Sequence, residues 1–179
     1  SLYDDKGVWQ GYINEKATEI ANGKQGAFIK QDRYATVTSK NYKAYQNFGW
    51  QEKQSAEAIT GKTYHIKGKY NHANGSTYLS LYDDKGVWQG YINEKATKTG
   101  DAKQRAYISD GRQVKVTKKG YNTWQNFSWK KKQSTDGLVG KEFTARGRYQ
   151  HINGSTYYSI YDAKGVWQGY ISSNATNLK

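Results

Sequence analysis

The stretch "YHIKGKYNHANGSTYLSLYDDKGVWQGYI" at residues 64–92 decides the fold. Apolar and polar residues alternate along "YHIKGKY" and again along "TYLSLY" with the period of two that half-buried strands require. Asn74-Gly75 between them is a strong hairpin signal, because a type I′ turn needs positive φ at both central residues. A second turn follows at "DDKG" and a third strand at "VWQGYI". The stretch therefore predicts a meander of short strands, typical of a small all-β barrel or sandwich.

The pattern returns 79 residues later, and a fixed period indicates repeated structural units. Residues 19–97 and 98–176 match at 39 of 79 positions without a gap. Residues 1–18 repeat the closing part of the unit word for word. We therefore expect a remnant of a preceding unit at 1–18, two whole units, and a tail at 177–179. The remnant alone can form one hairpin, which is marginally stable in water, so we expect it to be loose or docked.

Composition restricts how the units can be stabilised. Hydrophobic residues make up 35% of the chain and the mean hydropathy is −1.04, but there are 17 Tyr, 6 Trp and 4 Phe. Since each aromatic side chain buries about 150–250 Å², we expect aromatic packing to hold each unit together. The absence of Cys excludes a disulfide framework and thiol chemistry. No apolar run approaches the roughly 18 residues that a membrane span needs.

Positive charge is abundant and unevenly distributed. Lys and Arg total 28 against 15 acidic residues, a net charge of +13. Residues 19–97 hold 11 basic and 7 acidic residues, net +4, whereas residues 98–176 hold 14 and 5, net +9. Such a balance points to a nucleic acid, an anionic membrane surface or an anionic polymer as partner.

Three segments of the second unit, "NFSWKKKQS", "GKEFTARGRY" and "GSTYYSIYDAKGVWQGYISSNAT", resemble the GW modules of Gram-positive surface proteins. GW modules are SH3-like barrels that occur in tandem in autolysins, phage lysins and adhesins. Where the family has its Gly-Trp pair, this chain has Gly90-Tyr91 and Gly169-Tyr170. The resemblance implies tandem SH3-like barrels in an extracellular protein that is attached non-covalently to the bacterial cell wall. It also implies lipoteichoic acid, wall teichoic acid or another cell-wall polymer as ligand, or an anionic polysaccharide of a host.

Residues suited to catalysis do not form a consistent set. The three histidines are scattered, and only His72 and His151 occupy equivalent places. Asp83 lies in a turn, where Asp is favoured for bonding its own backbone, and the neighbouring Asp84 becomes Ala163 in the second unit. We therefore expect no catalytic residue, no metal site and no cofactor.

Basic residues form the main candidate site. The second unit has "WKKKQS" where the first has "WQEKQS". Strand alternation places Arg146 and Arg148 on one outward face, where Lys67 and Lys69 match them in the first unit. The candidate polyanion-binding residues are Lys130, Lys131, Lys132, Arg146, Arg148, Lys118, Lys119, Lys67 and Lys69. The alternative is that these lysines only solvate and protect strand edges.

Aromatic residues next to the basic run are candidates for ligand contact. We expect four to face a groove and stack on a sugar: Tyr42, Tyr45, Tyr121 and Trp124. We assign six others to the core: Phe48, Phe127, Trp50, Trp129, Trp88 and Trp167.

The leading hypothesis is non-catalytic binding of an anionic wall polymer by electrostatic contacts. An alternative is recognition of a neutral carbohydrate, peptidoglycan or a glucan through the exposed aromatic rings. Nucleic-acid binding shares the basic and aromatic profile, but none of its named motifs occurs, so no specific nucleic acid is expected.

Overall fold

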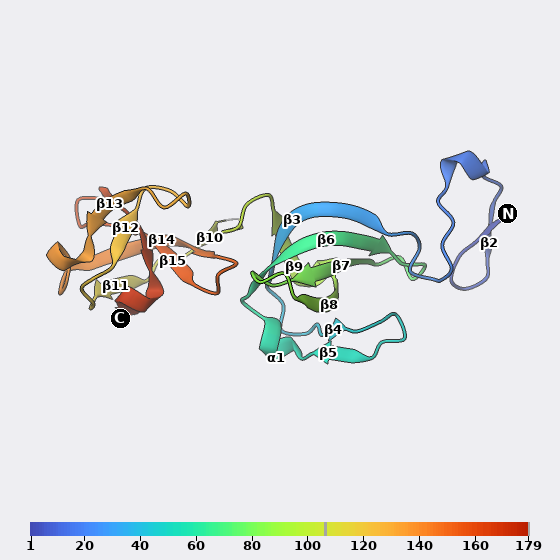
Figure 1. The fold of residues 1–179 in the computed structure, drawn as a ribbon, viewed down its shortest axis with the longest axis horizontal. Helices are drawn as coiled ribbons and strands as arrows, with labels where there is room; N and C mark the ends of the chain where they lie inside the picture. Colours follow the sequence, from blue (N-terminus) through green and yellow to red (C-terminus); the bar gives the residue numbers. More distant parts are fainter. Residues whose placement is uncertain (106, 179) are drawn as a thin grey trace. The chain divides into compact units, whose positions relative to one another are not determined.

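The computed structural model describes residues 1–105 and 107–178, which Figure 1 shows coloured along the chain. The chain divides into two compact units, Ser1–Asp101 and Ala102–Lys179. Ala106 and Lys179, the last residue of the predicted tail, lie outside the described residues. In the described part of the chain, no helix is long and apolar enough to cross a membrane.

The first unit contains an antiparallel sheet in the order β5-β4-β8-β7-β6-β3-β9. Its elements are β3 (Ile29–Val37), β4 (Ala44–Tyr45), β5 (Glu52–Gln54), α1 (Ala56–Ile59), β6 (Thr63–Asn71), β7 (Thr77–Tyr82), β8 (Trp88–Asn93), the 3₁₀ turn η2 (Glu94–Ala96) and β9 (Thr97–Gly100). The predicted meander corresponds to β6, β7 and β8. Because β9 pairs with β3, residues 97–100 complete the first sheet.

The second unit repeats this order as β13-β12-β16-β15-β14-β11-β17, with β10 also paired to β14. Its elements are β10 (Ile108–Ser109), β11 (Gln113–Val116), β12 (Asn122–Trp124), β13 (Lys131–Ser134), η3 (Thr135–Gly137), β14 (Glu142–Gln150), β15 (Thr156–Tyr161), β16 (Trp167–Ser172), η4 (Ser173–Ala175) and β17 (Thr176–Leu178). The continuous β3 of the first unit thus corresponds to two short strands, β10 and β11. Asn177 and Leu178 pair with β11, so this part of the predicted tail belongs to the sheet.

Each sheet surrounds its own aliphatic core. Ala35 of β3, Ala44 of β4 and Leu81 of β7 are all fully buried in one cluster, although β3 and β4 are not neighbours in the sheet. The sheet must therefore wrap around the core. The prediction of an all-β fold with two units is confirmed. The end strands β5 and β9 are not paired with each other in the described structure, so the sheet is open and not a closed barrel.

A β-bulge in β6 and in its counterpart β14 changes which face the following residues occupy. In β6 the register shifts between Ile66 and Gly68, which leaves Lys67 unpaired, and the same shift occurs around Arg146 in β14. A bulge places two residues opposite one. The alternation expected along this strand is therefore interrupted at its middle.

Residues 1–18 form the predicted hairpin, from β1 (Leu2–Tyr3) and β2 (Trp9–Gly11), followed by η1 (Glu15–Ala17). Leu2 and Ile13 are 43% and 48% exposed, whereas their counterparts Leu81 and Ile92 are fully buried in the first sheet. The hairpin thus has the local structure of β7 and β8 without the strands that cover them in a whole unit.

Candidate functional site

The hairpin between β12 and β13 presents three consecutive exposed lysines, Lys130, Lys131 and Lys132. Asn126 shapes the loop, because its side-chain oxygen accepts hydrogen bonds from the backbone N–H of Ser128 (3.1 Å) and of Lys130 (3.3 Å). Asn side chains commonly stabilise turns in this way. Among the described residues, no carboxylate lies within ion-pair distance of the three ammonium groups. Their charges are therefore available to an anionic ligand.

Trp129 precedes these lysines in a backbone conformation that bulky residues rarely adopt. Its φ is +63°, and its counterpart Trp50 has φ +65°. Such a conformation costs roughly 1–3 kcal/mol, so packing must maintain it. The Trp129 ring lies 5.3 Å from the ring of His151 and 5.4 Å from that of Tyr157. Trp50 and Trp129 are nevertheless 41% and 38% exposed, so their predicted place in the core is wrong.

A second tryptophan lies beneath the lysine hairpin. The Lys132 ammonium is 4.9 Å from the ring centroid of Trp167, a cation–π geometry. The Trp167 indole N–H donates a hydrogen bond to Ser159 Oγ at 3.1 Å. Lys53 and Trp88 repeat the cation–π pair at 4.8 Å in the first unit. Both tryptophans are half-buried on the face away from the aliphatic cores, so the core assignment is wrong for them as well.

Lys119 lies near the same hairpin. The pKa of Asp136 is lowered chiefly by the backbone hydrogen bond from Gly120, and further by Ser134 and by the charges of Lys119 and Lys131. Both positive charges therefore favour the charged form of the Asp136 carboxylate. The neighbouring Lys118 is exposed in the same loop. Lys118 and Lys119 thus add two exposed cations to the loop before β12, and Gly120 of this loop bonds Asp136 next to β13.

The corresponding hairpin of the first unit is partly neutralised. Gln51 and Glu52 stand where the second unit has Lys130 and Lys131. Glu52 accepts a 2.7 Å hydrogen bond from the Lys43 ammonium, and this contact raises the pKa of Lys43. The hairpin of the second unit is therefore more positively charged than that of the first, which accounts for part of the difference in net charge between the units.

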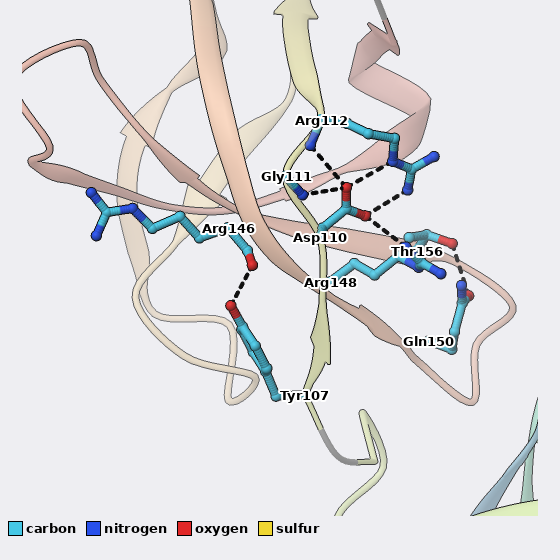
Figure 2. Close-up of polar contacts among 8 residues, drawn as sticks. All are labelled: Tyr107, Asp110, Gly111, Arg112, Arg146, Arg148, Gln150 and Thr156. Atoms are coloured by element: carbon cyan, nitrogen blue, oxygen red, sulfur yellow. Dashed lines mark hydrogen bonds and ion pairs between the residues drawn. The ribbon is translucent and has the colours of Figure 1, made fainter.

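The two arginines of β14 do not share a face. The Arg146 guanidinium lies 4.1 Å from the ring centroid of Tyr161, whereas Arg148 Nη1 is 2.7 Å from Asp110 Oδ2. Figure 2 shows the two side chains leaving the strand in different directions. The prediction of a shared outward face is wrong because the bulge at Arg146 interrupts the alternation. In the first unit, Lys67 likewise lies 4.2 Å from the ring of Tyr82, while Lys69 follows the bulge.

Asp110 binds two arginines, a contact that was not predicted. Its Oδ1 accepts a 2.7 Å hydrogen bond from Arg112 Nε, and its Oδ2 accepts bonds from Arg112 (2.6 Å) and Arg148 (2.7 Å) (Figure 2). The Asp110 side chain is only 2% exposed. The Arg112 hydrogen bonds, with those of Arg148 and two backbone N–H groups, hold the pKa of Asp110 well below its usual range. The only sequence signal was Asp110 in place of Gln31 of the first unit.

Each unit carries an aromatic cluster on the sheet face opposite the aliphatic core. In the first unit, the Phe48 ring stacks on Tyr91 at 4.8 Å and meets Tyr70 edge-on at 5.2 Å. In the second unit, the equivalent distances from Phe127 are 4.7 Å and 5.0 Å. The first cluster consists of Tyr45, Phe48, Trp50, Tyr70, His72, Tyr78, Trp88 and Tyr91, and its eight counterparts 79 residues later form the second.

The four aromatic residues expected to face a groove separate into two pairs. Tyr45 and Trp124 make edge contacts with Trp50 and Trp129 and so belong to the aromatic clusters. Tyr42 and Tyr121 instead pack against the aliphatic cores and are partly buried.

Other titratable groups have structural roles. Asp83 and Asp162 bond the backbone of their own turns, as expected from their place in the sequence. His151 stacks on Phe127, and burial lowers its pKa. Among the described residues, no group of three or more His, Cys, Asp or Glu side chains could hold a metal ion.

No protein-family model matches the sequence, and no curated protein matches it. The chain is similar to a crystal structure of a candidate autolysin from Listeria monocytogenes, with a TM-score of 0.39 and 14% sequence identity. The similarity covers 85% of this chain and 64% of the other, so this chain spans less than two thirds of that protein's length. At this level of similarity, the assignment of a site rests on the residues described above.

Proposed function

We propose that the chain is a non-catalytic pair of binding modules that holds its parent protein on the outside of a Gram-positive bacterial cell wall. The ligand is an anionic wall polymer such as lipoteichoic or wall teichoic acid. The observation that supports this proposal is the exposed run Lys130, Lys131 and Lys132, which forms no ion pair with a carboxylate of the described residues. The resemblance of both repeats to GW modules supports the same function.

The physical mechanism is neutralisation of a flexible polyphosphate by closely spaced cations. When a lysine contacts a phosphate, condensed counterions are released, and the binding constant falls steeply with salt. Lys119 adds another exposed cation to the second unit. Contacts of this kind are individually weak, and a repeated module gains affinity because its second contact is intramolecular.

Exchanging the hairpin sequences between the units tests the proposal. The double variant Lys130→Gln with Lys131→Glu gives the second unit the first unit's sequence and changes its charge by −3. We expect weaker retention of the whole chain on purified walls at low salt. The slope of log K against log salt should fall by about 0.7–0.9 for each lost lysine contact.

The reciprocal variant, Gln51→Lys with Glu52→Lys, is the matched control and should strengthen retention. On walls stripped of teichoic acid, the original chain should be retained no better than the Lys130→Gln, Lys131→Glu variant is. Unchanged retention of the Lys130→Gln, Lys131→Glu variant on intact walls at low salt would refute the proposal, provided that circular dichroism shows the fold unaltered.

A further inference from the structure

The aromatic cluster of the first unit borders a groove that carries no charge. The groove has a volume of about 430 Å³. Its lining comes mainly from Gln25, Gln46, Asn47, Phe48, Tyr70 and Tyr91. These are three amide side chains and three aromatic rings. A phosphate-rich polymer would find no counter-charge among them, so the groove calls for a different class of ligand.

Two of the three amides are free to bind a ligand. Within the described part of the chain, the side chains of Gln25 and Gln46 make no hydrogen bond to protein. Asn47 is committed instead, because its oxygen accepts a 3.0 Å bond from the backbone N–H of Gly49 and holds the hairpin loop. Each free glutamine offers one acceptor and two donors. Hydroxyl groups, which both donate and accept, are the natural partners for such a pair.

The floor of the groove is aromatic and neutral. The Phe48 ring lies nearly parallel to that of Tyr91, with an interplanar angle of 22°, and Tyr70 stands edge-on to both. The pKa of Tyr91 is raised to about 12, mainly by burial and to a smaller extent by the neighbouring Tyr70 hydroxyl. Tyr91 therefore keeps its proton at any physiological pH. Rings of this kind offer apolar surface together with a polar tip.

We propose that this groove binds a neutral oligosaccharide, with the rings contacting the C–H faces of the sugar and the two glutamines bonding its hydroxyls. This ligand class and this place differ from those of the lysine hairpin, so the proposal goes beyond the proposed function. The first unit then contributes uncharged sugar recognition while the second supplies electrostatic attraction.

The second unit has glutamines at the same two positions, but one of them already makes a hydrogen bond within the protein. Gln104 and Gln125 stand at the positions equivalent to Gln25 and Gln46. However, Gln125 Nε2 donates a 3.2 Å hydrogen bond to the backbone oxygen of Lys131. This amide is therefore less available, and the site should be stronger in the first unit.

The test titrates the whole chain with chitotetraose and, separately, with maltotetraose, in 0.05 M and 1 M NaCl. The first sugar represents N-acetylated glycan strands and the second an unsubstituted glucan. We expect at least one of them to shift the backbone amide resonances of residues 46–49 in both salt concentrations. The double variant Gln25→Ala, Gln46→Ala should bind about tenfold more weakly because two hydrogen bonds are lost.

The matched control is Gln104→Ala with Gln125→Ala, which should leave these shifts and the affinity almost unchanged. Absence of a shift with both sugars, loss of the shift in 1 M NaCl, or equal weakening by both double variants would overturn the proposal. The Lys130→Gln, Lys131→Glu variant should bind the sugar normally, so failure of this site and failure of polymer binding are distinguishable.

Discussion

Replacing Asp110 with Asn should destabilise the second unit and leave the first unit unchanged. The substitution keeps the shape of the side chain but removes the charge that holds Arg112 and Arg148. Breaking a buried ion pair typically costs 3–5 kcal/mol. Here the two arginine side chains are 41% and 30% exposed and can regain water, so we expect about 2–3 kcal/mol. For a unit of this size, such a loss lowers the melting temperature by roughly 10–20 °C.

The first unit provides an internal control for this experiment. Gln31 occupies the place of Asp110, within the single strand β3, whose pairing with β6 shifts register between Lys30 and Arg33. Hydrogen exchange measured on both units of the whole chain should show faster opening of β11 and β14 in the Asp110→Asn variant, with β3 and β6 unaffected. A Gln31→Ala variant should change neither unit by more than about 0.5 kcal/mol. Equal loss of protection in both units, or none in β11 and β14, would refute the reasoning.

The stability that Asp110 contributes should depend on pH. Because the native-state pKa of Asp110 lies below its ordinary value of 3.8, the unfolded chain takes up a proton before the native chain does. The stabilisation from Asp110 is therefore fully present above about pH 5 and is lost progressively as the pH falls below 4. The difference in stability between the original chain and Asp110→Asn should be constant from pH 5 to 8 and should shrink in acid. A gap that stays constant down to pH 2 would contradict the assignment.

Two further substitutions test the packing of the second unit. A Cβ at Gly147 would lie 2.0 Å from the Tyr107 ring, so Gly147→Ala should destabilise the second unit by about 1–3 kcal/mol. A Cβ at Gly111 meets open space, so Gly111→Ala should cost less. Equal losses of stability for the two variants in urea unfolding would contradict this prediction. Thr123 is fully buried and its hydroxyl has no hydrogen-bond partner among the described residues. Thr123→Val should therefore raise the urea midpoint, with a gain of about 1 kcal/mol, and a lower midpoint would show that the hydroxyl is satisfied.

Local signals in the sequence located the strands of the meander at residues 64–92 and the turns between them. A hairpin turn occurs at Asn74-Gly75 and an Asp-centred turn at Asp83–Gly86, where the pattern predicts turns, because each depends on contacts within a few residues. Of Asn74 and Gly75, however, Gly75 alone has a positive φ, so the predicted turn type I′ is wrong. The exposure of the lysines in the β12–β13 hairpin was also predictable, because consecutive side chains with the same charge must remain in water.

The assignment of aromatic residues failed where it depended on distant contacts. Trp50 and Trp129 were expected in the core because polar residues flank them, but a left-handed backbone turns both toward the surface. Tyr42 and Tyr121 were expected at a groove but lie against the aliphatic cores. The loop conformation that decides these positions is stabilised by rings from other strands, so no local pattern reveals it.

The sequence by itself determined the repeat, the all-β class and the greater charge of the second unit, since all three follow from composition and short-range periodicity. Only the tertiary structure decided which charges are free. A single bulge directs the side chains of Arg146 and Arg148 to different faces of β14. Asp110, 38 residues before Arg148 in the chain, partly neutralises Arg148. A count of charges treats every cation alike, whereas its availability depends on the partner that folding brings within hydrogen-bonding distance.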